Sequence, residues 1–548
     1  MRIKLWVSSL FTLGILSGFV LAIILAIAYV AGAIHWPLII GIVIGYNLLA
    51  WLVGPWITTL IYRWMYKAKF YTIDELPDRE LAAFITRICK EQSMRAPRIG
   101  IIDDQNPTAF TYGSAAYNAR IVYTAGLNHF LTKEEVNAVI AHEIGHIVHK
   151  DFIIMTVAAT LLQILYETYV VLTKTRNSRS TLGKRGEKGN GRAALYLIGL
   201  VSYVFYWIGT YLLLFLSRTR EYYADAFSAQ VTKNPNLLAS ALIKIAYGIA
   251  SVPDTEKTAH LLNNTRAQGI YDLKAANDVG LVYQNANQDK KLLARALTYD
   301  FVNPWAWIEE LSSTHPLTGK RIRALCAMSK TPLFDFDRLN ITVDKGRMWR
   351  GFFTDAIVQY SVPIAVLAGV LTVMIGALAG WSNLVLIAGG ITLGIGILAY
   401  LRVRYRFPLN AFDPLPVAEL MGDLYASPVR GRPVQLTGAA IGRGEAGFIL
   451  GEDMMFQDKT GIIYLNYESI IPLIGNWIFG WKKVEALINK PANATGWFLR
   501  GATHHLELYR YVCSEQTIKS WARAWHIIGA AILFAVLSAI VLFLALGM

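Results

Sequence analysis

The stretch AVIAHEIGHIVHKDFIIMTVAATLLQILYETYVVLT, residues 138–173, joins a metal-binding pattern directly to an apolar run. His142 and His146 are four residues apart, so on a helix their side chains share one face, one turn apart. Glu143 stands next to His142, where it can take a proton from water held by the same ion. Residues 152–173 are long and apolar enough to cross a bilayer. The sequence therefore predicts a hydrolytic metal site at the edge of a membrane.

The metal-binding helix is predicted independently of its histidines. Thr132 and Glu135 have the spacing of a capping box, and the apolar residues of 134–148 recur at helical intervals. His149 lies one turn beyond His146. We expect it to be a polar group near the membrane surface rather than a ligand.

Bulk composition also indicates a membrane protein. The chain has 548 residues, of which 54% are hydrophobic, and its mean hydropathy is +0.39. This composition excludes an ordinary soluble protein. The net charge of +14 does not imply a nucleic-acid partner, because basic residues gather at the cytoplasmic ends of membrane spans. The three cysteines are too far apart in sequence for a disulfide framework or a cysteine-rich metal site.

Seven apolar segments are candidate membrane spans, since a helix needs about 20 apolar residues to cross the hydrocarbon core. They lie at about 5–33, 37–62, 152–173, 194–216, 357–380, 384–401 and 525–547. The first is too long, and lacks the small-residue cleavage site, for a removable signal peptide. We expect it to be a retained anchor.

Lys and Arg near the span ends predict the orientation of the chain. Their distribution indicates a cytoplasmic N-terminus and puts residues 63–151, 217–356 and 402–523 on the cytoplasmic side of the inner cell membrane. The link 174–193 disagrees, because it carries seven basic residues and one acidic residue. The apolar hairpin 152–216 therefore either crosses the membrane twice or only dips into it.

A third metal ligand is expected, because a catalytic zinc takes three protein ligands and keeps one position open. The segment SRTREYYADAFS, residues 217–228, places Glu221 and Asp225 one turn apart on a helix expected to follow the fourth span. Taken alone, the pair would be a solvated helix face. Beside the metal helix, Glu221 can complete a His, His, Glu set for one zinc ion per chain. Asp225 can then accept a hydrogen bond from the far nitrogen of a ligating histidine.

Four segments in this order resemble the HtpX-type membrane metallopeptidases, relatives of the type I CAAX prenyl protease and of the mitochondrial Oma protease. The segments are NPTAFTYGS (106–114), RIVYTAGLNHFLTKEEVNAVIAHEIGHI (120–147), SRTREYYADAFS (217–228) and SSTHPLTGKRIRAL (312–325). Pro107 and Thr108 are inserted in the first segment relative to the family's Asn-Ala-Phe edge-strand motif. The resemblance covers about residues 63–330.

The resemblance implies a zinc endopeptidase with a gluzincin-type α+β fold and an active site on the cytoplasmic face. It implies these roles: His142, His146 and Glu221 as zinc ligands, Glu143 as general base, and Asp225 as the partner of a ligand. His315 and Arg321 would lie near the site and help hold the substrate or the developing oxyanion. A helix start for His315 and a surface charge for Arg321 are equally good readings.

The resemblance also implies a substrate-binding edge strand, made of Ala109, Phe110, Thr111, Tyr112 and Gly113. An extended polypeptide can pair with such a strand largely independently of its side chains. We therefore expect unfolded proteins or membrane proteins as substrates, as in protein quality control, and the lipid bilayer as the environment. Whether the chain forms a homo-oligomer stays open.

The expected fold is a polytopic α-helical membrane protein with a zinc-peptidase domain and a small C-terminal β-rich domain. Its parts are two N-terminal spans (1–62), the peptidase domain (63–330, interrupted by the hairpin 152–216), a linker (331–356), a transmembrane hairpin (357–401), a cytoplasmic β-rich domain (402–523) and a last span (525–547). Short β-rich runs separated by turns such as DKTG predict a small antiparallel barrel or sandwich, and the segment is weakly similar to the OB-like accessory domains of membrane proteases. The apolar stretch 469–481 is too short to span and is expected along the membrane surface.

Two other functions stay open at this point. One is a catalytically idle membrane scaffold with a structural zinc, which would have no need of a base such as Glu143. The other is a CAAX-type prenyl-protein protease, which has several more spans before its zinc motif than the two expected here. Transport is disfavoured, because the candidate spans hold few ionisable residues.

Overall fold

The computed structural model describes ten stretches of the chain. They are residues 12–13, 15–24, 26–27, 36–174, 190–251, 290–338, 341–444, 451–501, 504–513 and 516–547. The chain divides into two compact units, each built from several segments. The first unit is Met1–Ile245, Asn263–Asp272 and Glu310–Leu333, and the second is Ala246–Leu262, Leu273–Glu309 and Phe334–Met548. Parts of the expected first span and most of the basic link 174–193 lie outside the described residues.

Six helices among the described residues are long and apolar enough to cross a membrane. The spanning segments are Ile44–Met65, Asp151–Thr173, Ala193–Thr232, Lys345–Leu378, Leu384–Arg406 and Ala522–Leu546. They correspond to the second to seventh spans that the sequence predicted. The prediction of a multi-pass membrane protein is therefore confirmed.

A four-stranded sheet lies in the first unit. Its strands are β1 (Lys69–Tyr71), β2 (Arg98–Ile102), β3 (Ala109–Tyr112) and β4 (Arg120–Thr124), in the order β1-β2-β4-β3. Strands β2 and β4 are parallel, and the other two pairings are antiparallel. Every residue of β4 is buried, as expected of a central strand. Strand β3 is at the edge of this sheet.

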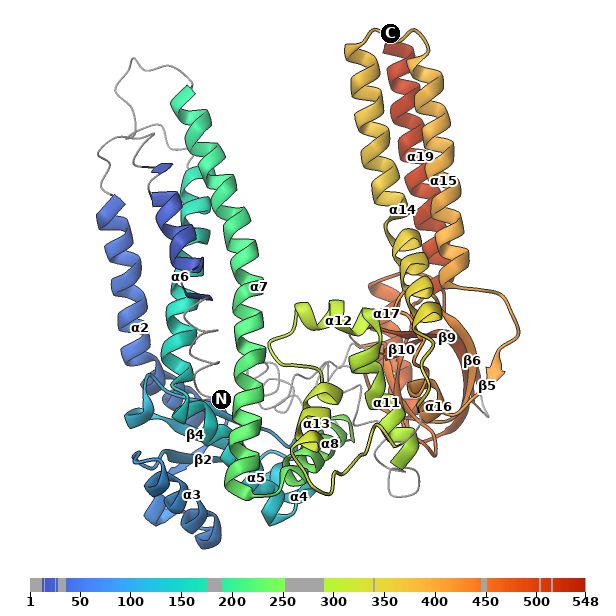
Figure 1. The fold of residues 1–548 in the computed structure, drawn as a ribbon. Helices are drawn as coiled ribbons and strands as arrows, with labels where there is room; N and C mark the ends of the chain where they lie inside the picture. Colours follow the sequence, from blue (N-terminus) through green and yellow to red (C-terminus); the bar gives the residue numbers. More distant parts are fainter. Residues whose placement is uncertain are drawn as a thin grey trace. The chain divides into compact units, whose positions relative to one another are not determined.

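Helices make up the rest of the first unit's regular structure. They are α2 (Trp36–Met65), η1 (Ile73–Glu75), α3 (Arg79–Glu91), η2 (Ala116–Asn118), α4 (Ala125–Phe130), α5 (Lys133–Val148), α6 (Asp151–Lys174), α7 (Asn190–Thr232), α13 (Thr318–Ala327) and the first part of α8 (Pro235–Ser251). Figure 1 shows α2, α6 and α7 as three long helices that lie side by side and rise from the part that holds the sheet.

Helix α7 is continuous where the sequence suggested two helices. A span at 194–216 was expected to be followed by a separate helix carrying Glu221, but α7 runs unbroken from Asn190 to Thr232. No proline interrupts these residues, so nothing in the sequence ends the helix. Glu221 is thus held on a rigid extension of a membrane helix.

Helix α5 begins where the sequence predicted and packs closely against α7. The capping box of Thr132 and Glu135 is present, which confirms that prediction. A Cβ atom at Gly145 would lie 3.1 Å from the Cα of Ala224 on α7, closer than side chains normally approach backbone. The hydroxyl of Ser228 also donates a hydrogen bond of 2.6 Å to the carbonyl of Ala138. The absence of a side chain at Gly145 therefore lets the two site helices approach each other.

The second unit contains a bundle of three apolar helices and a β-barrel (Figure 1). The bundle helices are α14 (Lys345–Leu378), α15 (Leu384–Arg406) and α19 (Ala522–Gly547). Shorter helices are α11 (Lys290–Val302), the start of α12 (Pro304–Leu311), α16 (Val417–Met421), α17 (Ile474–Phe479), η5 (Gly480–Val484) and α18 (Glu485–Leu487). The C-terminal part of the expected linker 331–356, from Lys345 onward, is helical and forms the start of α14.

Five strands close the barrel. They are β6 (Arg432–Arg443), β7 (Met454–Gln457), β8 (Ile462–Asn466), β9 (Pro491–Arg500) and β10 (His504–Cys513), with β5 (Asp413–Pro414) and β11 (Gln516–Lys519) added at its edges. Pairing runs β6-β7-β8-β10-β9 and back to β6, with β8 and β10 parallel. Five strands closed in this order form an OB-like barrel. The barrel alternative of the sequence prediction is confirmed.

Two local predictions concern the barrel's connections. DKTG is the turn between β7 and β8: the amide of Asp458 donates to the carbonyl of Gly461, and the Asp458 carboxylate accepts from the amides of Thr460 and Gly461. This confirms the hairpin. The apolar stretch 469–481 adjoins the start of α19, because the Trp525 indole donates to the carbonyl of Ser469 over 3.0 Å. Its position along the membrane surface stays a prediction.

Candidate metal centre

Three side chains from two helices meet in the first unit. His142 and His146 come from α5 and Glu221 from α7, and their ligand atoms all lie within 4.8 Å of one another. The two Nε2 atoms are 3.2 Å apart, and each is 3.5 Å from a carboxylate oxygen of Glu221. His142 and Glu221 are buried. The structure thus brings together the ligand set that the sequence proposed.

The far nitrogen of each histidine faces a carboxylate. Nδ1 of His142 lies 2.9 Å from Asp225, and Nδ1 of His146 lies 2.6 Å from Asp151. Each Nδ1 can therefore keep its hydrogen and donate it, which leaves both Nε2 lone pairs aimed at Glu221. Two imidazole nitrogens and one carboxylate, supported in this way, are a donor set suited to catalytic zinc. The residues present therefore fit the metal that the sequence implied.

Glu143 is held by the edge strand. The Thr111 hydroxyl on β3 donates a hydrogen bond of 2.5 Å to Oε2 of Glu143. Burial raises the pKa of the Glu143 carboxyl, and the nearby histidines and the Thr111 hydrogen bond offset part of that rise. A raised pKa brings a carboxyl closer to the range in which it can both accept and return a proton near neutral pH. The sequence listed Thr111 only as part of an edge strand.

Arg321 lies near the metal ligands, as expected, and contacts the acidic residues of the site. Its Nε and Nη2 atoms donate to the two oxygens of Asp225, at 2.9 and 2.6 Å, and Nη2 is 3.6 Å from Glu221. The side chain is only 2% exposed. Its guanidinium therefore neutralises and orients the buried carboxylates, and its expected contact with a substrate or an oxyanion stays a prediction. We assign Arg321 a positioning role.

His315 lies next to the ligand set. Its Nε2 is 3.6 Å from Oε1 of Glu221, and its Nδ1 is 3.0 Å from the hydroxyl of Thr314. Its own segment leads into α13, which carries Arg321. This position is compatible with the expected role near the reacting groups, and contact between His315 and a substrate stays a prediction.

The edge strand lies between the metal helix and a membrane helix. Strand β3 covers Ala109–Tyr112, and Gly113 follows its end. The Tyr112 hydroxyl is 2.9 Å from the hydroxyl of Thr59 on α2, and the ring of Phe110 packs 5.1 Å from that of Tyr62 on the same helix. A chain lying along β3 would therefore be close both to Glu143 and to the membrane.

Sequence reasoning missed Asp151 and its partner. Asp151 opens α6 directly after Lys150, which has a φ of 58°, and this tight reversal returns the carboxylate to His146. Arg220 on α7 forms an ion pair with Asp151. The only available signal was an acidic residue between the metal helix and an apolar span. His149 lies beside the rings of Tyr223 and Phe227, outside the ligand cluster, as expected.

The amino-acid sequence is similar to those of known proteases. The profile described as Peptidase family M48 matches residues 75–329. A protease HtpX homolog of Methanothermobacter thermautotrophicus is 30% identical over 239 residues, which are 43% of this chain and 84% of the relative. One of Aeropyrum pernix is 30% identical over 282 residues, or 51% and 82%. One of Pyrococcus abyssi is 27% identical over 332 residues, or 59% and 96%.

Among solved structures, the crystal structure of S. mikatae Ste24p overlaps 59% of this chain and 67% of its own, at 19% sequence identity. The TM-score is 0.32, which is too low to support an assignment of fold or function.

Proposed function

The chain belongs to peptidase family M48, among the HtpX-like membrane metalloproteases, and from that membership we propose a zinc-dependent endopeptidase of protein quality control. Its substrates are unfolded proteins or membrane proteins, and it cleaves them at the cytoplasmic face of the inner cell membrane. One zinc ion per chain is held by His142, His146 and Glu221. The observation that carries the proposal is the meeting of these three groups within 4.8 Å beside a buried glutamate.

The chemistry divides between the metal and the chain. When bound, zinc supplies a Lewis acid that polarises the scissile carbonyl and acidifies a water molecule. Glu143 accepts a proton from the attacking water and returns it to the leaving amine. Asp225 and Asp151 keep the two imidazoles in the orientation that ligation needs, and Arg321 balances the charge of Asp225.

Substrate binding follows from the edge position of β3. Among the described strands, β3 pairs with β4 alone, so its outer backbone groups are available to an extended peptide. Such pairing uses backbone hydrogen bonds, which every unfolded segment can supply. The contacts of Tyr112 and Phe110 with α2 favour substrates that arrive from the membrane. These features support a preference for unfolded and membrane-bound segments.

The orientation rests on basic residues at the ends of the spans. Arg63 is in the last turn of α2 and Lys67 and Lys69 follow that helix, and Arg402, Arg404 and Arg406 end α15. Basic residues mark the cytoplasmic side of short connections. Labelling of single cysteines introduced at Glu134 and at Asp413 in intact cells tests this, and labelling by a membrane-impermeant reagent before lysis would contradict it.

The decisive experiment replaces the base and keeps the ligands. Glu143→Gln should retain zinc and lose cleavage of a model membrane substrate, because an amide cannot accept the proton. Glu134→Gln is the matched control, since Glu134 is exposed on the same helix, away from the cluster. Undiminished cleavage by Glu143→Gln, with wild-type zinc content, would remove the assignment.

The same assay separates the alternatives. A structural-zinc scaffold predicts that wild-type protein binds zinc and cleaves nothing, so chelation would change stability alone. A prenyl-protein protease predicts cleavage of a prenylated peptide and none of its unprenylated form. We expect the unprenylated peptide to be cleaved at a comparable rate, because strand pairing does not depend on a lipid group.

A further inference from the structure

A polar cavity lies in the second unit. Its volume is about 760 Å³, and it is open to solvent and lined by residues of α11, the start of α14, the end of α15 and the segment leading into β6. All of its lining residues belong to the second unit. Nothing in the proposed peptidase chemistry uses it.

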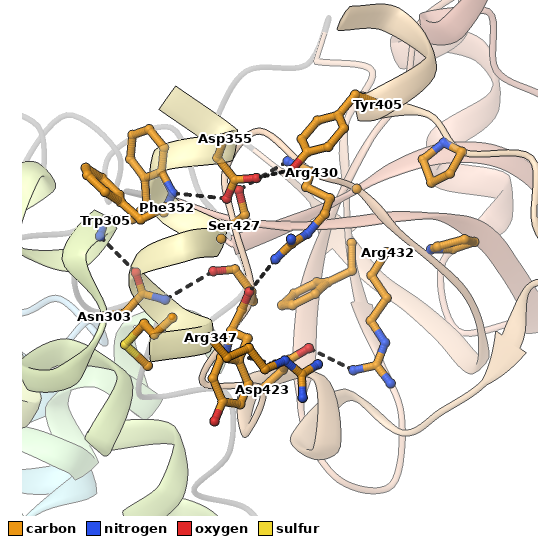
Figure 2. A pocket seen from close by; sticks show the side chains of 18 of the residues that line it. Asn303, Trp305, Arg347, Phe352, Asp355, Tyr405, Asp423, Ser427, Arg430 and Arg432 are labelled. Carbon is orange, nitrogen blue, oxygen red and sulfur yellow. Dashed lines mark hydrogen bonds and ion pairs between the residues drawn. The ribbon is translucent and has the colours of Figure 1, made fainter. Parts of the chain in front are cut away.

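Five arginines and two aspartates line the cavity, so its lining carries a net charge of +3. The arginines are Arg295, Arg347, Arg404, Arg430 and Arg432, and the aspartates are Asp355 and Asp423. In Figure 2 the side chains of Arg430 and Arg347 extend into the same space. Like charges gathered in one cavity repel one another, and an anion that enters relieves this repulsion.

Both aspartates are already engaged. Asp355 is 1% exposed and accepts hydrogen bonds from the Tyr405 hydroxyl at 2.5 Å and from the Trp305 indole at 3.3 Å. Asp423 pairs with Arg432 at 2.9 Å (Figure 2). Within the described part of the chain, Arg295, Arg347, Arg404 and Arg430 form no ion pair with a carboxylate. The excess positive charge is therefore not neutralised by the lining itself.

The cluster is more than a set of basic residues marking span ends. Arg347 and Arg404 lie at the ends of α14 and α15, where the usual enrichment of basic residues at the cytoplasmic ends of membrane spans would account for them. Arg430 instead comes from the segment before β6, and its guanidinium lies over Gly351 of α14, 3.8 Å from where a Cβ would be. Arg295 comes from α11, where its Nε donates to the carbonyl of Gly422. Tertiary packing has directed guanidinium groups from four parts of the chain into one cavity.

The position of the cavity indicates the source of the anion. Arg404 is in the last turn of α15, so the cavity adjoins the point where this span leaves the hydrocarbon. Arg347 is in the first turn of the 34-residue α14, which is longer than the hydrocarbon core and extends beyond it. On α15, the residues one, two and three turns before Arg404 share its face. These are Tyr400, Ile397 and Leu393, and all three are exposed. A ligand held by Arg404 could lay an apolar chain along this face.

We propose that this cavity binds the phosphate group of an anionic phospholipid, whose acyl chains lie along α15. Guanidinium groups match phosphate with paired N–H donors, and each of these arginines has donors beyond the contact it makes in the protein. Basic cavities at the cytoplasmic ends of spans are suited to lipid headgroups. The bound phosphate would join α14 and α15 to the barrel, since Arg347 and Arg404 come from the helices and Arg430 from the barrel side.

The test uses purified full-length protein in a neutral detergent. The probes are short-chain phosphatidylglycerol, short-chain phosphatidylcholine, glycerol 3-phosphate and inorganic phosphate, with affinity measured from the shift in melting temperature and lipid adducts counted by native mass spectrometry. Phosphatidylglycerol should bind at least about tenfold more tightly than phosphatidylcholine. The double variant R347Q/R404Q should bind phosphatidylglycerol at least about tenfold more weakly than wild type.

The control is R350Q/R402Q. It removes the same charge from the same ends of the same two helices, and neither residue lines the cavity. It should stay within about twofold of wild type, because only long-range charge is lost. Should R347Q/R404Q fail to fold, Arg430→Gln tests the cavity from the barrel side with both helices intact.

Each outcome decides the proposal. Equal losses in the two double variants, or equal binding of phosphatidylcholine and phosphatidylglycerol, would overturn it. Arginine-dependent binding of glycerol 3-phosphate as tight as that of the lipid would keep the phosphate site and assign it to a soluble phosphate ester. Peptidase activity is measured in parallel, and since the cavity lies outside the metal centre, loss of cleavage in Glu143→Gln does not affect this result.

Discussion

The metal centre and the arginine cavity collect charges in opposite ways, since the ligand and partner groups of the metal centre are buried or half-buried, whereas Arg295, Arg347 and Arg404 are exposed and Arg430 is half-buried. At the metal centre, each charged group has a partner of opposite sign or a hydrogen-bond partner: His142 faces Asp225, His146 faces Asp151, and Arg321 balances Asp225. In the cavity, four arginines lack a carboxylate partner among the described residues. A buried charge is costly without compensation, so the metal centre needs its paired groups, whereas water can solvate the exposed guanidinium groups of the cavity until an anion binds.

The difference separates an assembled site from an incomplete one. The metal centre is fixed by the protein's own contacts, and the two Nε2 atoms and the Glu221 carboxylate are the groups that would hold the ion. The lining of the cavity has more arginines than aspartates, so its net positive charge is not balanced by its own carboxylates. Ligand affinity at a self-sufficient polar network should fall steeply when one partner is replaced. Ligand affinity at a cluster of like charges should change only gradually when one charge is replaced. The following predictions test that contrast.

The largest effect is expected from Asp225→Asn. The oxygen of the new amide can still accept a hydrogen bond from His142. Its NH₂ group would then face the guanidinium of Arg321, so the site loses a negative charge and two hydrogen-bond donors face each other. Zinc affinity, measured by competition with a chelator, should fall by about 10–100-fold. Glu134→Gln, exposed on α5, should leave it unchanged. Wild-type zinc affinity in Asp225→Asn would mean that Asp225 is not needed to hold His142 in position for ligation.

A smaller effect is expected from Thr111→Val. The Thr111 hydroxyl favours the ionised form of Glu143 and lowers its pKa, so removing the hydroxyl should raise that pKa further. Because Glu143 must be ionised to accept a proton, the acidic limb of the kcat/KM profile should move to higher pH by up to about one unit. Activity should fall on the acidic side and persist on the alkaline side.

Thr111→Ser keeps the hydroxyl and is the control for this variant. A uniform loss of activity at every pH in Thr111→Val, with no displacement of the acidic limb, would show that Thr111 shapes the strand and does not tune the base.

The smallest effect is expected from Asp423→Asn in the cavity. Losing this carboxylate frees Arg432 and raises the net charge of the lining, so phosphatidylglycerol should bind more tightly by about two- to fivefold, as for a partly exposed ion pair. Asp413→Asn removes the same charge from an exposed position outside the cavity and should change affinity less. Weaker binding in Asp423→Asn would indicate that the ion pair shapes the site.

Much of the candidate site could be predicted because its signals are local. His142, Glu143 and His146 lie within five residues of one helix, and helical periodicity alone puts the two imidazoles on one face. Glu221 and Asp225 repeat that spacing, and the apolar segments and the DKTG turn follow equally short-range rules. Thr111, Asp151 and Arg321 contribute through contacts whose direction no local pattern reveals.

The sequence by itself determined the membrane helices, the zinc-binding pattern and the presence of a β-rich domain, because hydrophobic periodicity and short turn signals act over a few residues. Only the tertiary structure decided that α7 continues from the membrane to the metal, that Arg321 serves Asp225, and that arginines between positions 295 and 432 line one cavity. These features depend on packing between segments far apart in the chain. Their distances are set by the approach of elements to each other, as at Gly145, and not by the spacing of residues along the sequence.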